Sequence, residues 1–141
     1  MIIGIGKEAI ISNIYDEDDV VRQRIRSQLE RILQDMPKGQ IFCVGKYKNG
    51  ISMDFCKICA NMNILNEVVV PYDGNDWGWP APIKNQFQTI LDKAKRVKRL
   101  HNGGFNPKKI KDMEAYISKM SDIVINITVD SDEVKINLVT K

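Results

Sequence analysis

The sequence predicts an α/β protein with a Rossmann-like, mostly parallel sheet, helices on both faces of that sheet and a C-terminal antiparallel hairpin. Short apolar runs typical of buried strands alternate along the chain with segments whose apolar residues recur at helical spacing. The last segment instead alternates apolar and polar residues on both sides of the turn sequence DSDE, which predicts a hairpin. Because the chain has 141 residues and is 43% hydrophobic, we expect one domain that spans residues 1–141.

The first predicted strand is the apolar run at residues 2–5, which ends at Gly6. A helix is expected within residues 15–39, because acidic residues crowd its start and Pro37 with Gly39 ends it. The apolar residues of this helix are predicted to share one face: Val21, Ile25, Leu29, Ile32 and Met36.

Two further predicted strands, at 41–44 and 67–72, flank a second helix. A loop that contains glycines and lysines precedes that helix, and Asn49 or Ser52 is expected to cap its first turn. A third helix is marked by apolar residues at helical spacing: Ile83, Phe87, Ile90, Leu91, Ala94 and Val97. The sequence RVKRL at 96–100 is either the end of this helix or a short strand.

The last part of the chain predicts a helix followed by the hairpin. Pro107 is well placed to begin the helix, whose inner face is expected to be Ile110, Met113, Tyr116, Ile117 and Met120. The hairpin at 122–139 is expected to add an antiparallel edge to the sheet. Because such an edge and its apolar faces are hard for a small monomer to cover, we expect a homo-oligomer, with a dimer as the default.

Charge and hydropathy argue against several classes of protein. The 21 basic and 18 acidic residues leave a net charge of +3, which is too small to indicate a nucleic-acid binder by itself. The basic cluster KAKRVKRLHN at 93–102 makes nucleic-acid binding an alternative, because its side chains could contact phosphates. Its charges, however, interleave with apolar residues as on a solvated helix face. No stretch approaches the roughly 18 apolar residues of a membrane span. We therefore expect a soluble, cytoplasmic protein with no membrane partner.

The three cysteines do not predict a redox or zinc site. Cys56 and Cys59 form a CxxC pair, but they lie among apolar residues at helical spacing, which favours burial in a helix. A four-ligand zinc site would lack partners, because the chain has no second CxxC and His101 is its only histidine. We therefore expect neither a metal nor a cofactor.

Three unusual loops follow the first three predicted strands, at the edge where open parallel sheets bind ligands. The first two contain glycines, which let backbone N–H groups approach an anion, and lysines, which favour phosphate, but neither matches a Walker A or GxGxxG motif. The third, PYDGNDWGW, offers indoles that can stack on a base and carboxylates that can accept ribose hydroxyls. The candidate ligand-binding residues are Gly6 and Lys7 in the first loop; Gly45, Lys46, Lys48, Asn49, Gly50, Ser52 and Asp54 in the second; and Tyr72, Asp73, Asp76, Trp77 and Trp79 in the third.

The order of these segments resembles the SLOG superfamily of Rossmann-like nucleotide-binding proteins, which includes the LOG enzymes. IGIGK at 3–7 is similar to the first turn of that family, and VGKYKNGISMDFCKICANMN at 44–63 is similar to its glycine-rich turn and helix start, with Asp54 at the Asp position. VVVPYDGNDWGWPAPIKNQFQTILDKAKRV at 68–97 matches best, and AYISKMSDIVI at 115–125 corresponds to the late helix and strand. The resemblance covers most of the chain as far as Asn126.

The chain also departs from the family pattern. Ser52 stands where the family commonly has glycine, and Met113 with Glu114 stands near the place of an Arg-Asn pair. The sequence VDSDEVKINLV follows the last matching strand in place of a GGT-type phosphate loop, and the PGGxGTxxE motif of LOG phosphoribohydrolases has no counterpart. The resemblance therefore implies ligand binding rather than LOG-type catalysis.

The function implied by the resemblance is non-catalytic binding of a nucleotide or an ADP-ribose-derived signalling molecule. Superfamily members fused to effector modules are implicated in sensing nucleotide signals in bacterial antiviral defence. A stand-alone copy is then expected to sequester such a signal, as a viral or mobile-element decoy, in the cytoplasm of a bacterium or phage-infected host cell. The alternatives are a nucleotide N-glycosidic hydrolase of LOG type, with its carboxylate from Glu8, Asp54, Asp73 or Asp76, and a nucleic-acid-binding module.

Two roles remain open for several of these candidates. Trp77 or Trp79 contacts ligand, or both tryptophans pack their loop onto the following helix. Asp54 contacts ligand or caps its helix, and Asp73 and Asp76 contact ligand or form turns.

Overall fold

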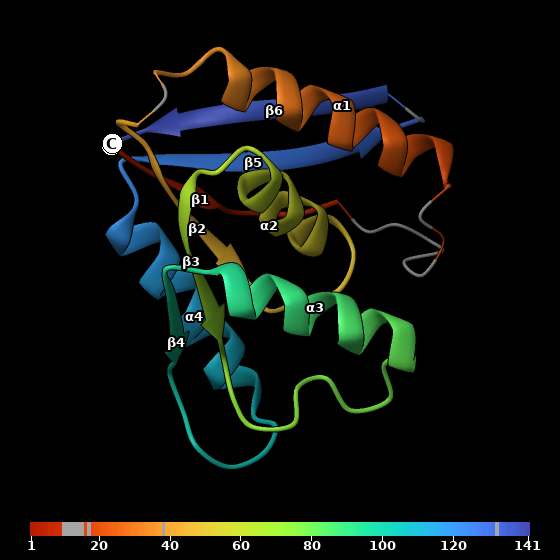
Figure 1. Cartoon of the computed structure of the whole chain (residues 1–141), viewed down its shortest axis with the longest axis vertical. Helices are drawn as coiled ribbons and strands as arrows, with labels where there is room; N and C mark the ends of the chain where they lie inside the picture. The colour runs from red at the N-terminus through yellow and green to blue at the C-terminus, as the bar shows by residue number, and fades with distance from the viewer. Residues whose placement is uncertain (10–15, 17, 38, 132) are drawn as a thin grey trace.

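The computed structural model describes residues 1–9, 16, 18–37, 39–131 and 133–141, and it contains a six-stranded sheet in the order β4-β3-β2-β1-β5-β6 (Figure 1). Strands β1 to β5 are parallel, and β6 pairs with β5 in the antiparallel direction. The strands are β1 (Ile2–Ile5), β2 (Phe42–Lys46), β3 (Leu65–Val70), β4 (Arg96–Arg99), β5 (Ile123–Asp130) and β6 (Glu133–Thr140). The helices are α1 (Val20–Gln34), α2 (Ile51–Asn61), α3 (Ala81–Lys93) and α4 (Pro107–Met120). The predicted α/β class, with its mostly parallel sheet and C-terminal hairpin, is confirmed.

The connections between strands decide which face of the sheet each helix covers. From β1 to β4 the chain crosses the sheet in one direction, and right-handed crossovers then place α1, α2 and α3 on the same face. The connection from β4 to β5 returns to the far side of β1, so α4 lies on the opposite face, behind the sheet in Figure 1. The strand order therefore reverses at the β1–β5 pair, the kind of position at which open α/β sheets bind ligands.

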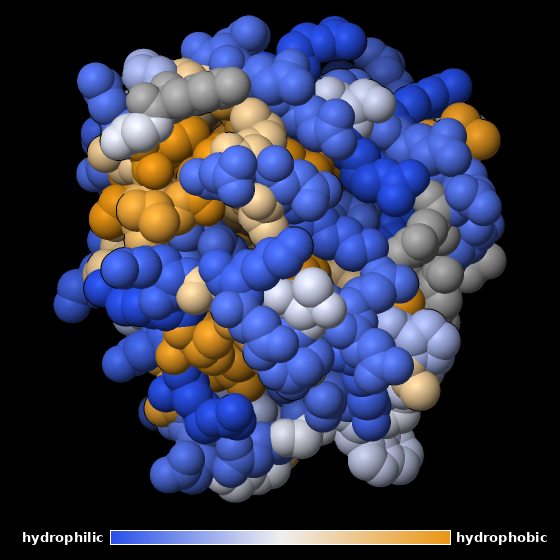
Figure 2. Space-filling model, viewed as in Figure 1, coloured by the Kyte–Doolittle hydropathy of each residue, from blue (hydrophilic) through white to orange (hydrophobic). Residues whose placement is uncertain are grey.

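The two faces of the sheet are covered unequally. On one face, α1 and α2 pack against β1, β2 and β5 in a cluster that includes Phe55, and α2 and α3 pack against β3 around Phe87. On the other face, a smaller cluster joins Ile117 of α4 to β2 and β3. Figure 2 shows the face that carries α1 to α3, whose surface is mainly hydrophilic with apolar areas between the helices and along one side.

Helix α1 is shorter than the predicted range 15–39, and residues 15, 17 and 38 of that range lie outside the described residues, as does Asp132 of the predicted turn. The Asp19 side chain caps α1 by accepting a hydrogen bond from the Arg22 N–H at 2.9 Å. Four residues of α1 are buried: Arg22, Ile25, Leu29 and Leu33. Of the predicted inner face, Ile25 and Leu29 are buried, and Val21 and Met36 are half-buried and pack against the same core cluster. Ile32 is half-buried and is not part of that cluster, whereas Leu33 and Arg22, which were not predicted, are buried.

Two local expectations are corrected or decided by the structure. Helix α2 begins at Ile51 with Gly50 as its N-cap, and among the described residues no side chain caps it, so the expected cap from Asn49 or Ser52 was wrong. The sequence RVKRL forms the edge strand β4 rather than a helix end. Its basic residues therefore lie along a sheet edge, where charged side chains discourage pairing with another strand.

Candidate functional site

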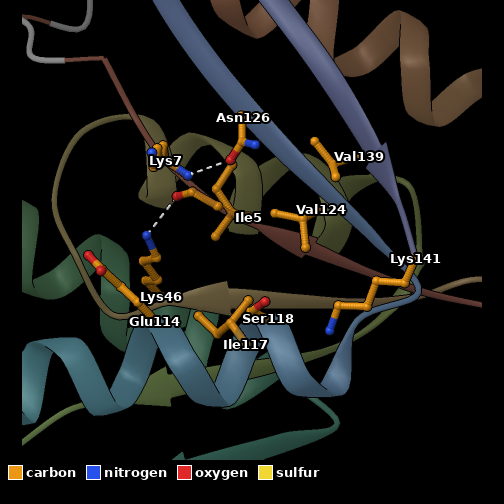
Figure 3. A pocket seen from close by; sticks show the side chains of 11 residues that line it. Ile5, Lys7, Lys46, Glu114, Ile117, Ser118, Val124, Asn126, Val139 and Lys141 are labelled. Carbon is orange, nitrogen blue, oxygen red and sulfur yellow. Dashed lines mark hydrogen bonds between the residues drawn. The ribbon is translucent and has the colours of Figure 1, made fainter.

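Two cavities lie next to each other at the carboxyl ends of the parallel strands, on the face that α4 covers. The first, of about 300 Å³, lies between α4 and the β5–β6 hairpin (Figure 3). We call it the apolar cavity, and its lining includes Ile5, Lys7, Ile117, Val124, Asn126 and Val139. The second, of about 280 Å³, lies under the β3–α3 loop. We call it the aromatic cavity, and its lining includes Tyr47, Lys48, Asn49, Tyr72, Trp79 and Met113.

Lys46 and Glu114 line both cavities and mark the junction between them. Lys46 is the last residue of β2, only 3% exposed, and its Nζ donates a hydrogen bond to the Gly6 carbonyl at 2.7 Å (Figure 3). Burial lowers the pKa of the Lys46 ammonium, while Glu8 and Glu114 oppose this shift. Glu114 projects from α4, and in the described part of the chain no group donates a hydrogen bond to it. The junction thus carries one buried cation beside a carboxylate with free acceptors.

A carboxylate of the protein itself occupies the amino end of α2. The Glu8 side chain, 4% exposed, accepts a hydrogen bond from Ser52 Oγ and lies 3.1 Å from Lys48 Nζ and 3.6 Å from Lys46 Nζ. A helix amino end favours negative charge, and two ammonium groups add to that preference. The position predicted for a phosphate is therefore held by Glu8, and Ser52 is turned toward Glu8 and lines neither cavity.

Asp54 forms a sealed ion pair with Arg22. Arg22 Nε donates to Asp54 Oδ2 at 2.6 Å and Nη2 donates to Oδ1 at 2.9 Å, and both side chains are 0% exposed. This two-point geometry is the strongest form of the Arg–carboxylate contact. Asp54 thus joins α2 to α1 and lines neither cavity. Its side chain does not cap α2 either, so in this structure Asp54 holds the two helices together.

Asn49 contributes an unpartnered donor to the aromatic cavity. Its Oδ1 accepts a hydrogen bond from the Gly50 N–H at 2.8 Å, but its Nδ2 has no hydrogen-bond partner. The residue is only 6% exposed, and an unpaired buried amide N–H₂ costs free energy unless a ligand or water accepts from it. Asn49 is therefore a residue of the cavity lining whose amide donor has no partner among the described residues.

The two tryptophans of the β3–α3 loop have opposite environments. Trp79 packs on Tyr47 and Phe87, with ring centroids 5.1 and 5.5 Å away, and it also lines the aromatic cavity. Trp77 is 88% exposed and lines neither cavity. Asp76 accepts a hydrogen bond from Tyr47 Oη at 3.1 Å, and burial together with Asp76 raises the pKa of Tyr47 to about 12. Asp76 therefore fixes the floor of the cavity without lining it.

Asp73 ties two loops together at the rim of the aromatic cavity. Its carboxylate accepts from Arg99 Nη1 at 2.6 Å and from the Gly103 N–H at 3.0 Å. Next to it, Tyr72 lines the cavity and meets Phe105 edge to face at 5.7 Å. These contacts place the β3–α3 and β4–α4 loops side by side, so Asp73 supports the rim rather than lining the cavity.

The glycines predicted to present N–H groups to an anion have other roles here. The Gly6 N–H donates to the Ile125 carbonyl at 2.7 Å, and the Gly50 N–H donates to Asn49. A Cβ on Gly6 would lie 2.3 Å from Asn126 Oδ1, and one on Gly45 would lie 2.5 Å from Cys56 Sγ. Gly6 and Gly45 are therefore needed for close packing at these positions.

Of the predicted site residues, the structure gathers seven around the two cavities. These are Gly6, Lys7, Lys46, Lys48, Asn49, Tyr72 and Trp79. Sequence reasoning missed Glu114 and Asn126. Glu114 precedes the inner residue Ile117 by about one helical turn, so it lies on nearly the same side of the predicted helix. Asn126 belongs to the more polar of the two sets of alternating residues in its strand, so helical and strand spacing could have indicated both positions.

The buried cysteines and the described acidic residues form no metal site. Cys43, Cys56 and Cys59 are free and buried, and burial raises the pKa of the Cys56 thiol. Within the described ranges, no group of three or more His, Cys, Asp or Glu residues is arranged to hold a metal ion.

Comparisons with known proteins do not assign the chain to a family. No protein-family model matches it, and no curated protein matches it. The SLOG resemblance therefore stays a prediction. Among the helices of the described residues, none combines the length and apolar composition needed to cross a bilayer.

Proposed function

We propose that this protein binds a nucleotide or an ADP-ribose-derived molecule in the aromatic cavity and does not turn it over. The observation that carries the proposal is the lining of this cavity, which combines Tyr72, Trp79 and Lys48 with Asn49, a residue whose amide donor is unpartnered. An aromatic wall suits a base, an amide donor suits a ring nitrogen or carbonyl, and an ammonium suits phosphate. The cavity also lies at the edge of the sheet where such folds bind ligands.

Binding without turnover is supported by the state of the carboxylates. Hydrolysis of a glycosidic bond needs an available carboxylate beside the ribose. Asp54 is paired with Arg22, Asp73 with Arg99, and Glu8 with two lysines. Of the described residues that line the two cavities, Glu114 alone carries a side-chain carboxylate, so no second side-chain carboxylate stands beside it in the lining to form an acid–base pair, and we propose that it accepts ribose hydroxyls. A protein that holds its ligand intact in this way would act by sequestration.

The proposal is tested by calorimetric titration with AMP and ADP-ribose. Replacing Tyr72, which lines the cavity and is not part of the core, is expected to remove a stacking surface, so Tyr72→Ala should weaken binding about tenfold. Trp77→Ala is the matched control, because Trp77 belongs to the same loop, is 88% exposed and lines neither cavity. Its affinity should equal that of the wild type. Equal losses in the two variants, or no binding by the wild type, would contradict the proposal.

A further inference from the structure

The apolar cavity exists because the second face of the sheet extends beyond the only described helix on that face. Helix α4 packs on β1 and β2, while the hairpin β5–β6 continues past it. Ile117 of α4 and Val124 and Val139 of the hairpin face one another across the space, as Figure 3 shows. Val139 is 48% exposed although it lines this wall, so a bound group would cover apolar surface that the protein leaves open.

This cavity adjoins the aromatic cavity, and the two have a common boundary. Lys46 and Glu114 line both spaces. Each cavity alone, at about 300 and 280 Å³, is at or below the roughly 300–1,000 Å³ typical of ligand sites, whereas a ligand that occupied both would have a site within that range. The geometry therefore suits a ligand longer than one nucleoside.

The charges at the junction indicate what would connect the two parts of such a ligand. Lys7 and Lys141 line the apolar cavity, Lys48 lines the aromatic cavity, and Lys46 lies between them. Against these four side-chain cations stand Glu8, which pairs with Lys46 and Lys48, and Glu114. The side-chain balance is two positive charges, which favours an anionic linker such as a pyrophosphate.

We propose that the two cavities form one groove for a pyrophosphate-linked dinucleotide, with one nucleoside in the aromatic cavity and a second ring-bearing group in the apolar cavity. This inference rests on the proposed function and extends it to the ligand class. The linker would lie over Lys46, and Ile117, Val124 and Val139 would contact the second ring.

The test compares NAD, which has two ring-bearing ends, with AMP, which has one. Ser118 is exposed on α4 and lines the apolar cavity, so Ser118→Trp fills that cavity alone. Ala115→Trp is the matched control on the same helix, since Ala115 is exposed and lines neither cavity. Val139→Trp, from the opposite wall, replaces Ser118→Trp if that variant does not fold, as judged by circular dichroism.

We expect the wild type to bind NAD at least about tenfold more tightly than AMP. Ser118→Trp should lower the NAD affinity to that of AMP and leave AMP binding unchanged, and Ala115→Trp should change neither. Equal wild-type affinities, equal losses for both ligands, or an unchanged NAD affinity in Ser118→Trp would overturn the two-part groove while leaving AMP binding in place. Failure of the wild type to bind either ligand would instead overturn the proposed function, and this inference with it.

Discussion

At the scale of single residues, charge burial is the feature that most constrains this protein. Arg22 and Asp54 meet in a fully buried pair, and Glu8 and Lys46 are each almost fully buried beside partners. A buried charge is tolerated only while its partner is present, because each ion has given up its hydration. These residues therefore connect α1, α2 and the amino-terminal loop to the edge where the cavities lie.

Breaking the Arg22–Asp54 pair should destabilise the fold strongly. Asp54→Asn removes the buried carboxylate that faces the Arg22 guanidinium, and the expected loss in free energy of unfolding is about 3–5 kcal/mol. Asp92→Asn is the control, because Asp92 is exposed and its side chain accepts one hydrogen bond within the described residues, from Gln88, so its change should stay within about 0.5 kcal/mol. Urea denaturation followed by circular dichroism measures both, and similar values for the two variants would disprove the importance of the pair.

Alkaline titration should reveal two abnormal tyrosines. Burial, with Asp76 beside Tyr47 and Glu67 beside Tyr116, raises the pKa of each phenol to about 12. Because these folded-state values exceed the usual value of 10, the two groups contribute stability that is present below pH 10 and is lost as pH rises toward 12. Absorbance at the phenolate band should show late ionisation that Tyr47→Phe and Tyr116→Phe each reduce. Titration of all tyrosines near pH 10 would contradict these contacts.

Individual roles at the site were less predictable from sequence than the loops that carry them. The glycines and lysines of the first two loops indicated the edge of the sheet at which the two cavities lie, because residue type alone marks such loops. Whether Asp54 faces a ligand or Arg22 depends on how α1 packs on α2. The spacing of residues within either helix does not determine that packing. The same holds for Glu8, whose partners Lys48 and Ser52 are about forty residues away.

At the scale of elements, close contact between β1 and α4 sets the geometry of the groove. A Cβ on Gly4 would lie 2.7 Å from Ile117 Cγ2 and still closer to Ser121 Oγ. Any side chain at this position therefore has to push α4 away from the sheet. The cavities, both lined by α4 residues, would change shape with that shift.

Gly4→Ala should consequently lower stability by about 1–3 kcal/mol, the usual cost of overpacking. Gly104→Ala is the matched control, since nothing lies within 4 Å of a Cβ at that position and the change should be close to neutral. Thermal unfolding of both variants provides the comparison. A Gly4→Ala protein as stable as Gly104→Ala would show that α4 is not held against β1 as described.

The elements themselves were largely predictable from the sequence. Apolar periodicity located the strands and helices, Pro107 marked the start of α4, and strict alternation marked the hairpin. Arg22 was missing from the predicted inner face of α1, because periodicity reserves buried positions for apolar residues. The strand β4 was left as one of two alternatives, since its basic residues fit a solvated helix equally well.

At the scale of the whole molecule, both sheet edges and the open part of the second face bear on assembly. Leu138 and Val139, on edge strand β6, are 44% and 48% exposed. The homo-oligomer expected from the hairpin stays a prediction, and the exposed residues of β6 are the surface through which two copies would pair. Sedimentation velocity should give a mass about twice the 16.1 kDa of the chain, and Leu138→Lys should reduce it to one copy. A wild-type protein that sediments as 16.1 kDa at high concentration would refute the dimer.

The central claim is that the groove holds a nucleotide-type ligand intact. The most direct measurement is a thermal-shift screen with AMP, ADP-ribose, NAD and cyclic nucleotides, followed by mass analysis of each recovered ligand. Binding to the folded state raises the melting temperature by mass action, by an amount set by ligand concentration over Kd. We expect at least one of these molecules to raise the melting temperature and to be recovered unchanged. A ligand recovered cleaved would make the protein an enzyme, and no shift with any of them would contradict nucleotide binding altogether.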